Sequence, residues 1–188
     1  MTPGMTARAV DARAELGEAG DAVLSPEALR RIDREIAKYP AGQQQSAVMS
    51  ALAIVQDEKG WLATATMDFV ARYLGMPAVA VYEVATFYAM YNLKPTGRFK
   101  LTICTNLPCA LQDAVRSAEY LKAKLGIGFG ETTADGLFTL VEGECMGACG
   151  DSPVLLVNNK RMCSWMRPEA IDALLAELTA APDGGGAR

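Results

Sequence analysis

The chain has 188 residues, of which 51% are hydrophobic and 21% are charged, and its formal net charge is −4. This composition is typical of a globular protein, and the acidic balance argues against nucleic acid or an acidic membrane surface as the main partner. The sequence contains no histidine. That absence excludes Rieske iron-sulfur centres, zinc sites with histidine ligands and catalytic triads that depend on histidine.

The ends of the chain and its cysteines indicate the compartment. Residues 1–24 lack the apolar core of a signal peptide and are too acidic for a transit peptide, so we expect a flexible tail there. The five cysteines are odd in number and too few for a disulfide-stapled secreted protein of this length. No apolar run reaches the ~20 residues of a membrane span. We therefore expect a soluble protein of a reducing cytoplasm, with no membrane insertion.

Residues 25–93 have the pattern of a small helical bundle. Ser25 can cap a helix that has Pro26 in its first turn. Apolar residues then recur at the spacing of one helical face in four successive segments, which end at Gly or Pro or are separated by them. The four faces are formed by Leu29, Ile32 and Ile36; by Val48, Leu52 and Val55; by Met67, Val70 and Leu74; and by Val81, Val84 and Tyr88.

Residues 94–180 follow a different pattern, with short alternating segments and two helical ones. Residues 99–103 alternate as a strand does. A helix follows, which begins near Cys109 and carries Leu111, Val115 and Leu125 on one apolar side. Further strands are expected at 137–141, 154–157 and 161–165, and a last helix from Pro168. The predicted fold class is α+β, a helical bundle followed by the order β-α-β-β-β-α, with a tail at 181–188.

Four of the five cysteines form two pairs. Cys104 and Cys109 have the spacing C-x4-C, and Cys145 and Cys149 have the spacing C-x3-C. Four thiols without histidine indicate an iron-sulfur cluster, an all-cysteine zinc site or two redox-active thiol pairs. Zinc sites and dithiol oxidoreductases usually have C-x2-C, which neither pair shows, so both stay as less favoured alternatives.

Strand direction predicts that the two pairs meet. A strand, a helix and a further strand normally form a crossover with the two strands parallel, and parallel strands end at the same edge of a sheet. Each pair follows the end of one of these strands. Backbone N–H groups near the cysteines can donate to sulfur, and Leu107, Pro108, Met146 and Ala148 are expected to keep the site fairly dry. A cluster with four anionic ligands in such surroundings resists further negative charge, so we expect a low reduction potential. Cys163 lies within a predicted strand, where we expect it to pack in the core.

Several segments around these cysteines carry a resemblance to a known family. Those segments are Thr86-Phe87-Tyr88 with Tyr91-Asn92, Lys94 to Phe99, Cys104-Thr105 with Pro108-Cys109, Gly130 to Thr133 with Asp135-Gly136, and Glu144 to Cys149. Together they resemble the thioredoxin-like [2Fe-2S] subunit of respiratory NADH:quinone oxidoreductase, the 24-kDa-type or E subunit of complex I. The resemblance runs from about Ser25 to Leu178.

The resemblance implies a thioredoxin-like ferredoxin domain behind a helical domain. It also implies that Cys104, Cys109, Cys145 and Cys149 ligate one [2Fe-2S] cluster. The implied partners are a flavin subunit, which binds NADH and FMN, and further subunits of the peripheral arm on the cytoplasmic side of the inner membrane. NADH gives up two electrons as hydride and an iron-sulfur centre passes one at a time, so the flavin splits the pair. We therefore expect no catalytic residue on this chain.

Other parent complexes and other classes of protein stay open. Related subunits serve NAD-linked hydrogenases and formate dehydrogenases, and a zinc-binding or thioredoxin-like interaction domain is a third hypothesis. The chain departs from the family pattern at Gly150 to Pro153 and at Cys163-Ser164-Trp165. Neither departure includes a predicted ligand, but both could change the surface that contacts partners. The aromatic stretch 81–93 either covers the junction of the two domains, which we favour, or contacts a partner.

Overall fold

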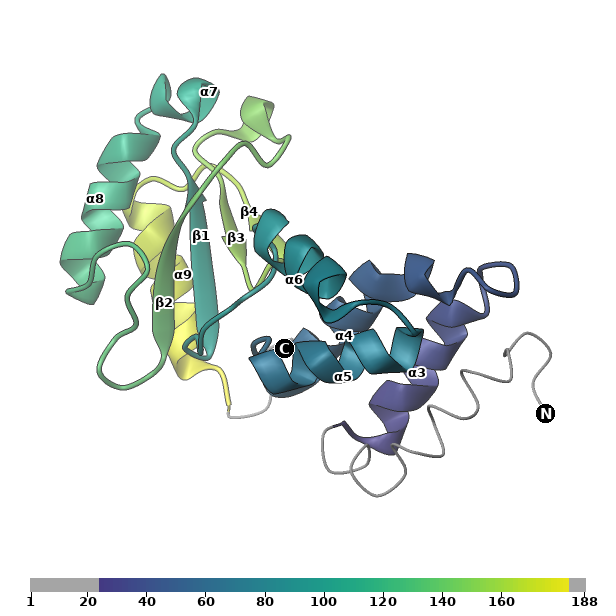
Figure 1. Ribbon diagram of the computed structural model, residues 1–188. Helices are drawn as coiled ribbons and strands as arrows, with labels where there is room; N and C mark the ends of the chain where they lie inside the picture. The colour runs from purple at the N-terminus through teal and green to yellow at the C-terminus, as the bar shows by residue number, and fades with distance from the viewer. Residues whose placement is uncertain (1–23, 183–188) are drawn as a thin grey trace. The chain divides into compact units, whose positions relative to one another are not determined.

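The computed structural model describes residues 24–182, which divide into two compact units at the Pro95–Thr96 bond (Figure 1). The two units are described separately below. Most of the two predicted tails, residues 1–23 and 183–188, lies outside the described residues. Within residues 24–182, no helix combines the length and the hydrophobicity that a membrane span requires.

The first unit is helical, as predicted. Its elements are α3 (Pro26–Ile36), the short 3-10 helix η1 (Gln44–Ala47), α4 (Val48–Lys59), α5 (Thr64–Leu74) and α6 (Ala78–Phe87). The Ser25 hydroxyl accepts a hydrogen bond from the N–H of Ala28 and caps α3. Gly60 and Gly75 adopt the left-handed conformation that ends α4 and α5.

The core of this unit extends beyond the four predicted helical faces. Leu24 is buried at 1% exposure, and Tyr91 is buried at 6% exposure with its hydroxyl donating to the carbonyl of Met49 at 2.9 Å. Phe87, by contrast, is 80% exposed at the end of α6. The aromatic stretch 81–93 therefore contains both a core residue and a surface residue.

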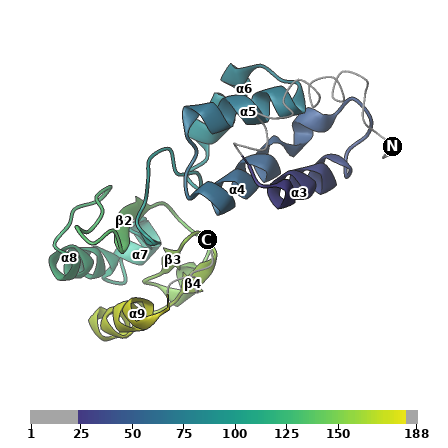
Figure 2. The same ribbon diagram turned by 90° about the horizontal axis from the view of Figure 1, so that it is seen from below.

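The second unit has the predicted α+β order. Its elements are β1 (Phe99–Cys104), α7 (Leu107–Ala110), α8 (Ala114–Leu125), β2 (Phe138–Gly143), η2 (Cys149–Asp151), β3 (Leu155–Val157), β4 (Arg161–Cys163) and α9 (Pro168–Ala180). The strand order is β2-β1-β3-β4, with β1 and β2 parallel and the other two pairings antiparallel. Figure 2 shows α8 and α9 along the same face of this sheet.

The prediction of one continuous helix from Cys109 is wrong, because the structure has two helices there. In place of a single helix that begins near Cys109, the structure has the short α7 and the separate α8, because Asp113 adopts a left-handed conformation with φ 66°. A residue in that conformation cannot continue an α-helix. As a result Leu111 and Val115, predicted on the buried side, are 75% and 52% exposed.

Candidate metal centre

The structure places both cysteine pairs at one edge of the sheet. The parallel register pairs Cys104, the last residue of β1, with Gly143, the last residue of β2. Cys145 follows two residues later, and Cys109 lies on α7, which leaves the same edge (Figure 1). The N–H of Thr105 donates to the carbonyl of Gly143 at 3.2 Å and ties the two loops together.

The members of each pair lie near each other. The Sγ atoms of Cys145 and Cys149 are 3.5 Å apart, and the thiols of Cys104 and Cys109 are linked by a hydrogen bond. Two sulfurs bound at ~2.3 Å to one tetrahedral metal ion lie about 3.8 Å apart. The hydroxyl of Ser152 lies 3.3 Å from the Sγ of Cys109 and donates to the carbonyl of Cys149, so the two pairs are neighbours. The Cys145–Cys149 pair is close to the separation at which it can hold one metal ion.

This two-plus-two arrangement bears on the kind of metal centre. A mononuclear zinc site gathers four ligands around one ion, whereas an all-cysteine [2Fe-2S] cluster takes two thiolates at each of two irons. The donor set fits the two-iron cluster. The assignment of the four cysteines as ligands stays a prediction.

The two pairs differ in burial. Cys104 and Cys109 are each 1% exposed and pack with Ala114 and Val154, whereas Cys145 and Cys149 are exposed.

The expected shielding of the site is present on one side only. Met146 and Ala148 pack against the cluster of buried residues that contains Cys104 and Cys109, as predicted. Leu107 and Pro108 do not shield the site, because both lie on the solvent side of α7 and are exposed. The expectation that Leu107 and Pro108 help to keep the site fairly dry is therefore wrong.

Backbone N–H groups and burial set the ionisation of these thiols. The N–H of Gly147, 3.5 Å from the Sγ of Cys145, lowers the pKa of that thiol, and the hydrogen bond from Cys149 adds to the effect. The same contact raises the pKa of Cys149. Burial raises the pKa of Cys104, against the N–H groups of Asn106 and Met146. The shift of the Cys145 pKa thus favours the thiolate, which is the form that binds a metal.

Gly147 and Ser152 shape the second loop. Gly147 has φ 76°, a left-handed conformation that favours glycine and turns its N–H towards sulfur. The hydroxyl of Ser152 is 3.3 Å from the Sγ of Cys109 and donates to the carbonyl of Cys149 at 2.7 Å. Ser152 is 2% exposed and so links the two pairs from within. The sequence offers no sign of this role, because Ser152 stands out there only as part of a segment that departs from the family pattern.

Two carboxylates also join the loops, and neither is among the residues predicted for the site. Glu142 accepts a hydrogen bond from the hydroxyl of Thr105 at 2.7 Å, and Glu144 accepts one from the side-chain amide of Asn106 at 2.6 Å. Their positions three residues and one residue before Cys145 are the only signal that the sequence offers. Both carboxylates add negative charge beside the cysteines.

Cys163 lies apart from the four paired cysteines. It is the last residue of β4, pairs with Leu155 and is 9% exposed in the core of the second unit. Burial raises the pKa of its thiol. The expectation that Cys163 packs in the core is confirmed.

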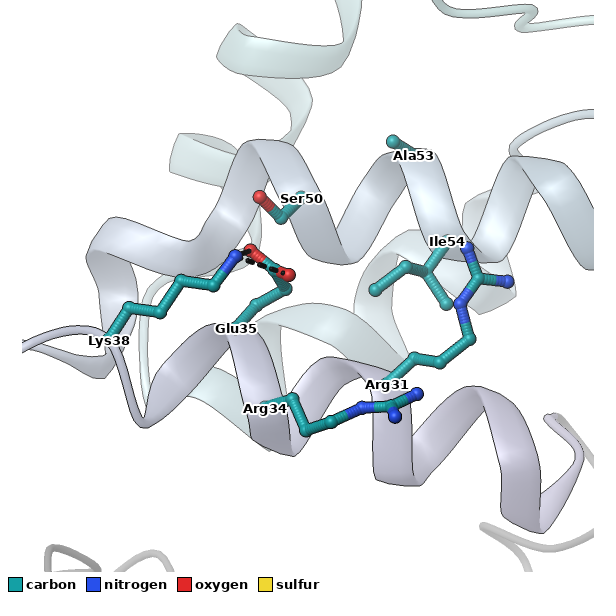
Figure 3. Close-up of a pocket in the computed structure, with 7 residues that line it drawn as sticks. All are labelled: Arg31, Arg34, Glu35, Lys38, Ser50, Ala53 and Ile54. Carbon is teal, nitrogen blue, oxygen red and sulfur yellow. Dashed lines mark hydrogen bonds and ion pairs between the residues drawn. The ribbon is translucent and has the colours of Figure 1, made fainter.

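A pocket of about 510 Å³ lies in the first unit, between α3 and α4 (Figure 3). Each of its three cations has a carboxylate partner: Lys38 pairs with Glu35 at 2.7 Å, Arg31 with Asp57 at 3.2 Å and Arg34 with Glu27 at 3.4 Å. None of the paired cysteines lines this pocket. The pocket is therefore separate from the candidate metal centre.

The chain is similar to known proteins over most of its length. The profile of the thioredoxin-like [2Fe-2S] ferredoxin family matches residues 32–179. NADH-quinone oxidoreductase subunit 2 of Thermus thermophilus is 38% identical over 149 residues, which cover 79% of this chain and 82% of that protein. The E subunit of NADH-quinone oxidoreductase from Rickettsia bellii is 40% identical over 144 residues, 76% of this chain and 86% of that protein.

A solved structure shares the fold at a lower level of identity. The NAD+-reducing [NiFe]-hydrogenase in its H2-reduced state aligns with a TM-score of 0.56 and 20% identity over 65% of this chain. The match spans 21% of the hydrogenase chain, and it concerns the fold alone. The profile match covers most of the chain and agrees with the identity to the two oxidoreductase subunits, so this chain belongs to the thioredoxin-like [2Fe-2S] ferredoxin family.

Proposed function

We propose that this chain is the E-type electron-transfer subunit of NADH:quinone oxidoreductase, and that Cys104, Cys109, Cys145 and Cys149 hold its one [2Fe-2S] cluster. The observation that carries the proposal is the meeting of two cysteine pairs at one sheet edge, with the thiols of Cys145 and Cys149 in contact at 3.5 Å. The relatives, which are named as the E subunit or subunit 2 of NADH-quinone oxidoreductase, support the parent enzyme.

The residues of this chain would bind and tune the cluster. When bound, the cluster supplies a site that accepts and returns one electron at a time. Cys104 and Cys109 hold it on the buried side, and Cys145 and Cys149 hold it on the exposed side.

The groups around the four cysteines have two opposite effects on negative charge at the cluster: some stabilise it and others oppose it. The N–H groups of Asn106, Met146 and Gly147 donate to sulfur and stabilise negative charge there. Glu142 and Glu144, which lie beside the cysteines, oppose added negative charge, and this opposition favours a low reduction potential.

The same proposal assigns the remaining chemistry to partners. NADH and FMN bind to a flavin subunit that exchanges electrons with this cluster, and no catalytic residue lies on this chain. The assembly belongs to the peripheral arm on the cytoplasmic side of the inner membrane. The relatives' parent enzyme supports this placement.

Reduction of the assembled complex by NADH tests the proposal. The full chain, tagged and expressed in its own host, should co-purify with a flavin subunit and with the membrane subunits of a quinone oxidoreductase. NADH should reduce the flavin of this complex, and dithionite should make the signal of a reduced [2Fe-2S] cluster appear in electron paramagnetic resonance (EPR) spectra; the separated chain should give that signal with dithionite and not with NADH. A complex that NADH does not reduce, or that gives no [2Fe-2S] signal with dithionite, contradicts the proposal.

The fold shared with an NAD+-reducing hydrogenase keeps one alternative, an equivalent subunit of an NAD-linked hydrogenase or formate dehydrogenase. Co-purification separates the two. A nickel hydrogenase or a molybdenum formate dehydrogenase in the purified complex, in place of membrane quinone-site subunits, assigns the chain to the alternative.

A further inference from the structure

One buried hydroxyl lies between the two cysteine pairs. Ser152 directly follows η2 and is 2% exposed. Its hydroxyl oxygen is 3.3 Å from the Sγ of Cys109 and 2.7 Å from the carbonyl oxygen of Cys149. A serine hydroxyl has one hydrogen to donate, so its two neighbours cannot both receive it fully. The neighbour that receives this hydrogen determines how Ser152 acts on the site.

While Cys109 is a thiol, both contacts of Ser152 can form together. The thiol donates its hydrogen to the hydroxyl oxygen, and the hydroxyl donates its own hydrogen to the carbonyl of Cys149, which can only accept. A cysteine that binds a metal is a thiolate and has no hydrogen left to donate. As a ligand, Cys109 is therefore a second acceptor, and its sulfur competes with the carbonyl of Cys149 for the hydrogen of Ser152.

Backbone hydrogen bonds hold the segment around Ser152 in place. They run from the N–H of Trp165 to the carbonyl of Asp151 at 2.9 Å, from the N–H of Met166 to the carbonyl of Pro153 at 2.8 Å, and from the N–H of Cys104 to the carbonyl of Val154 at 3.1 Å. These bonds tie the residues on both sides of Ser152 to the end of β1 and to the segment after β4. The hydroxyl hydrogen can therefore turn while the oxygen keeps its place beside the sulfur.

The surroundings of Cys109 strengthen a hydrogen bond to its sulfur. Cys109 is 1% exposed and packs in a buried cluster with Cys104, Ala114 and Val154. Charges inside such a cluster are screened less than in water, and a hydrogen bond to a charged group is roughly twice as strong as one between neutral groups. A donor at Cys109 therefore has a larger effect than a donor at the exposed Cys145 or Cys149.

The preference of the hydroxyl between its two acceptors depends on the charge of the sulfur. An electron that enters the metal centre makes the ligand sulfurs more negative, whereas the carbonyl of Cys149 stays neutral. The hydroxyl keeps its proton throughout, and only the acceptor of its hydrogen changes. Hydrogen bonds to the sulfurs are among the factors that set the potential of an iron-sulfur centre. A bond that is stronger in the reduced state raises this potential.

We propose that Ser152 is a positioning residue that raises the reduction potential of the metal centre, because its hydroxyl donates to the sulfur of Cys109 when the centre is reduced. This inference rests on the proposed function and on Cys109 as a ligand. Ser152 thereby offsets part of the effect of Glu142 and Glu144, whose charges oppose added negative charge. It also gives a role to one residue of the segment Gly150 to Pro153, where the chain departs from the family pattern.

A redox titration of the full chain, purified without oxygen and followed by EPR, tests this inference. Ser152→Ala should still bind a cluster that dithionite reduces, but at a more negative midpoint potential. At the wild-type midpoint, the ratio of reduced to oxidised cluster should fall on the order of tenfold, as expected for the loss of a hydrogen bond to a charged group. For one electron, this change corresponds to a shift of about 59 mV.

Two further variants separate the hydroxyl from the rest of the side chain and of the loop. Ser152→Thr keeps a hydroxyl and should keep a midpoint potential near that of the wild type. Ser164→Ala is the matched control, because it removes a hydroxyl that lies 3.1 Å from the carboxylate of Asp151 instead of a cysteine sulfur. Its midpoint potential should equal that of the wild type.

A purely structural role of Ser152 gives a different result. Ser152→Ala would then reduce the amount of bound cluster, or abolish it, and any remaining cluster would keep the wild-type midpoint potential. Either result overturns the inference, as does a shift to more positive potential or an equal shift in Ser164→Ala.

The outcomes also separate this inference from the function on which it rests. A wild-type chain that gives no [2Fe-2S] signal with dithionite contradicts the proposed function. A wild-type chain that gives the signal, with Ser152→Ala at the same midpoint potential, contradicts the role of Ser152 alone.

Discussion

At the scale of single residues, the five cysteines fall into three environments. Cys104 and Cys109 are buried beside each other, Cys145 and Cys149 meet in an exposed loop, and Cys163 packs within the sheet core. The absence of histidine and the pairing of the thiols can be recognised in the sequence. The difference in burial cannot, because it depends on how the loops fold over Val154 and Ala114.

Replacement of single cysteines tests the ligand assignment. Cys→Ser at position 104, 109, 145 or 149 should abolish or strongly weaken the EPR signal of the reduced cluster, because a hydroxyl is a poor substitute for a thiolate at iron. Cys163→Ser is the matched control and should leave the signal intact. A cluster that needs Cys163 and tolerates Cys149→Ser shows that the assignment is wrong.

Three residues to which the sequence pattern assigns no role also join the loops. Ser152, Glu142 and Glu144 each connect one cysteine loop to the other through a hydrogen bond. Each link joins residues 37 to 43 positions apart in the chain. Sequence spacing cannot reveal such pairs until the register of β1 and β2 is known.

At the scale of elements, the N-terminus of α3 is held by a carboxylate from α4. Glu58 accepts hydrogen bonds from the N–H of Ser25 at 3.0 and 3.1 Å and from its hydroxyl. Burial opposes the ionisation of Glu58, but the hydrogen bonds from Ser25 and the contact with Lys59 outweigh it, so the pKa of Glu58 is lowered. This cap joins two helices and adds to the local cap that the sequence predicts from Ser25.

The cap predicts a dependence of stability on pH. Because the pKa of Glu58 is lower in the folded chain, its stabilisation is present above the unfolded pKa of about 4.3 and is lost as pH falls through the folded pKa. Glu58→Gln should lower the free energy of unfolding at pH 7 by about 1 kcal/mol, and the difference from wild type should shrink below pH ~4. Urea titrations followed by circular dichroism measure it.

A matched variant completes this test. Glu83→Gln removes an exposed carboxylate from α6 and should change the free energy of unfolding little at either pH. A Glu58→Gln effect that does not change from neutral to acidic pH means that the ionised cap does not stabilise α3.

The segment that leads into β1 has no room for a side chain at Gly97. A Cβ built on Gly97 would lie 2.9 Å from the carbonyl oxygen of Gly136 and 3.0 Å from the carbonyl carbon of Phe138, and both atoms belong to the backbone. Gly97→Ala should therefore lower the free energy of unfolding by about 1–3 kcal/mol, as overpacking does. The urea midpoint at unchanged m value is the measurement.

Gly150 is the control for this substitution. A Cβ at Gly150 meets nothing within 4 Å, so Gly150→Ala should leave the urea midpoint close to that of the wild type. Equal effects of the two substitutions would show that the close approach at Gly97 does not decide stability.

Most elements can be predicted from the sequence because local patterns specify them. The caps at Ser25, Gly60 and Gly75 mark helix ends, and Asn158 and Asn159 form the turn between β3 and β4 with φ values of 51° and 56°.

The break at Asp113 cannot be predicted in this way. Aspartate rarely adopts a left-handed conformation, and nothing in the apolar spacing of the segment signals it. That break determines which side chains of α7 and α8 surround the cysteines.

At the scale of the whole molecule, the candidate metal centre follows from the topology of the second unit. The parallel pairing of β1 and β2 brings together loops that lie far apart in the sequence, and β4 delivers Trp165 to the same edge. The parallel pairing can be predicted through the β-α-β rule. The exposure of Leu107 and Leu111 cannot, since an apolar residue on a predicted helix is normally assigned to the core.

The most direct test of this account is the metal content of the full chain purified without oxygen. We predict iron and acid-labile sulfide in equal amounts, and an EPR signal that appears on reduction by dithionite. Zinc in place of iron, with no acid-labile sulfide even after reconstitution with iron and sulfide, would contradict the two-iron cluster.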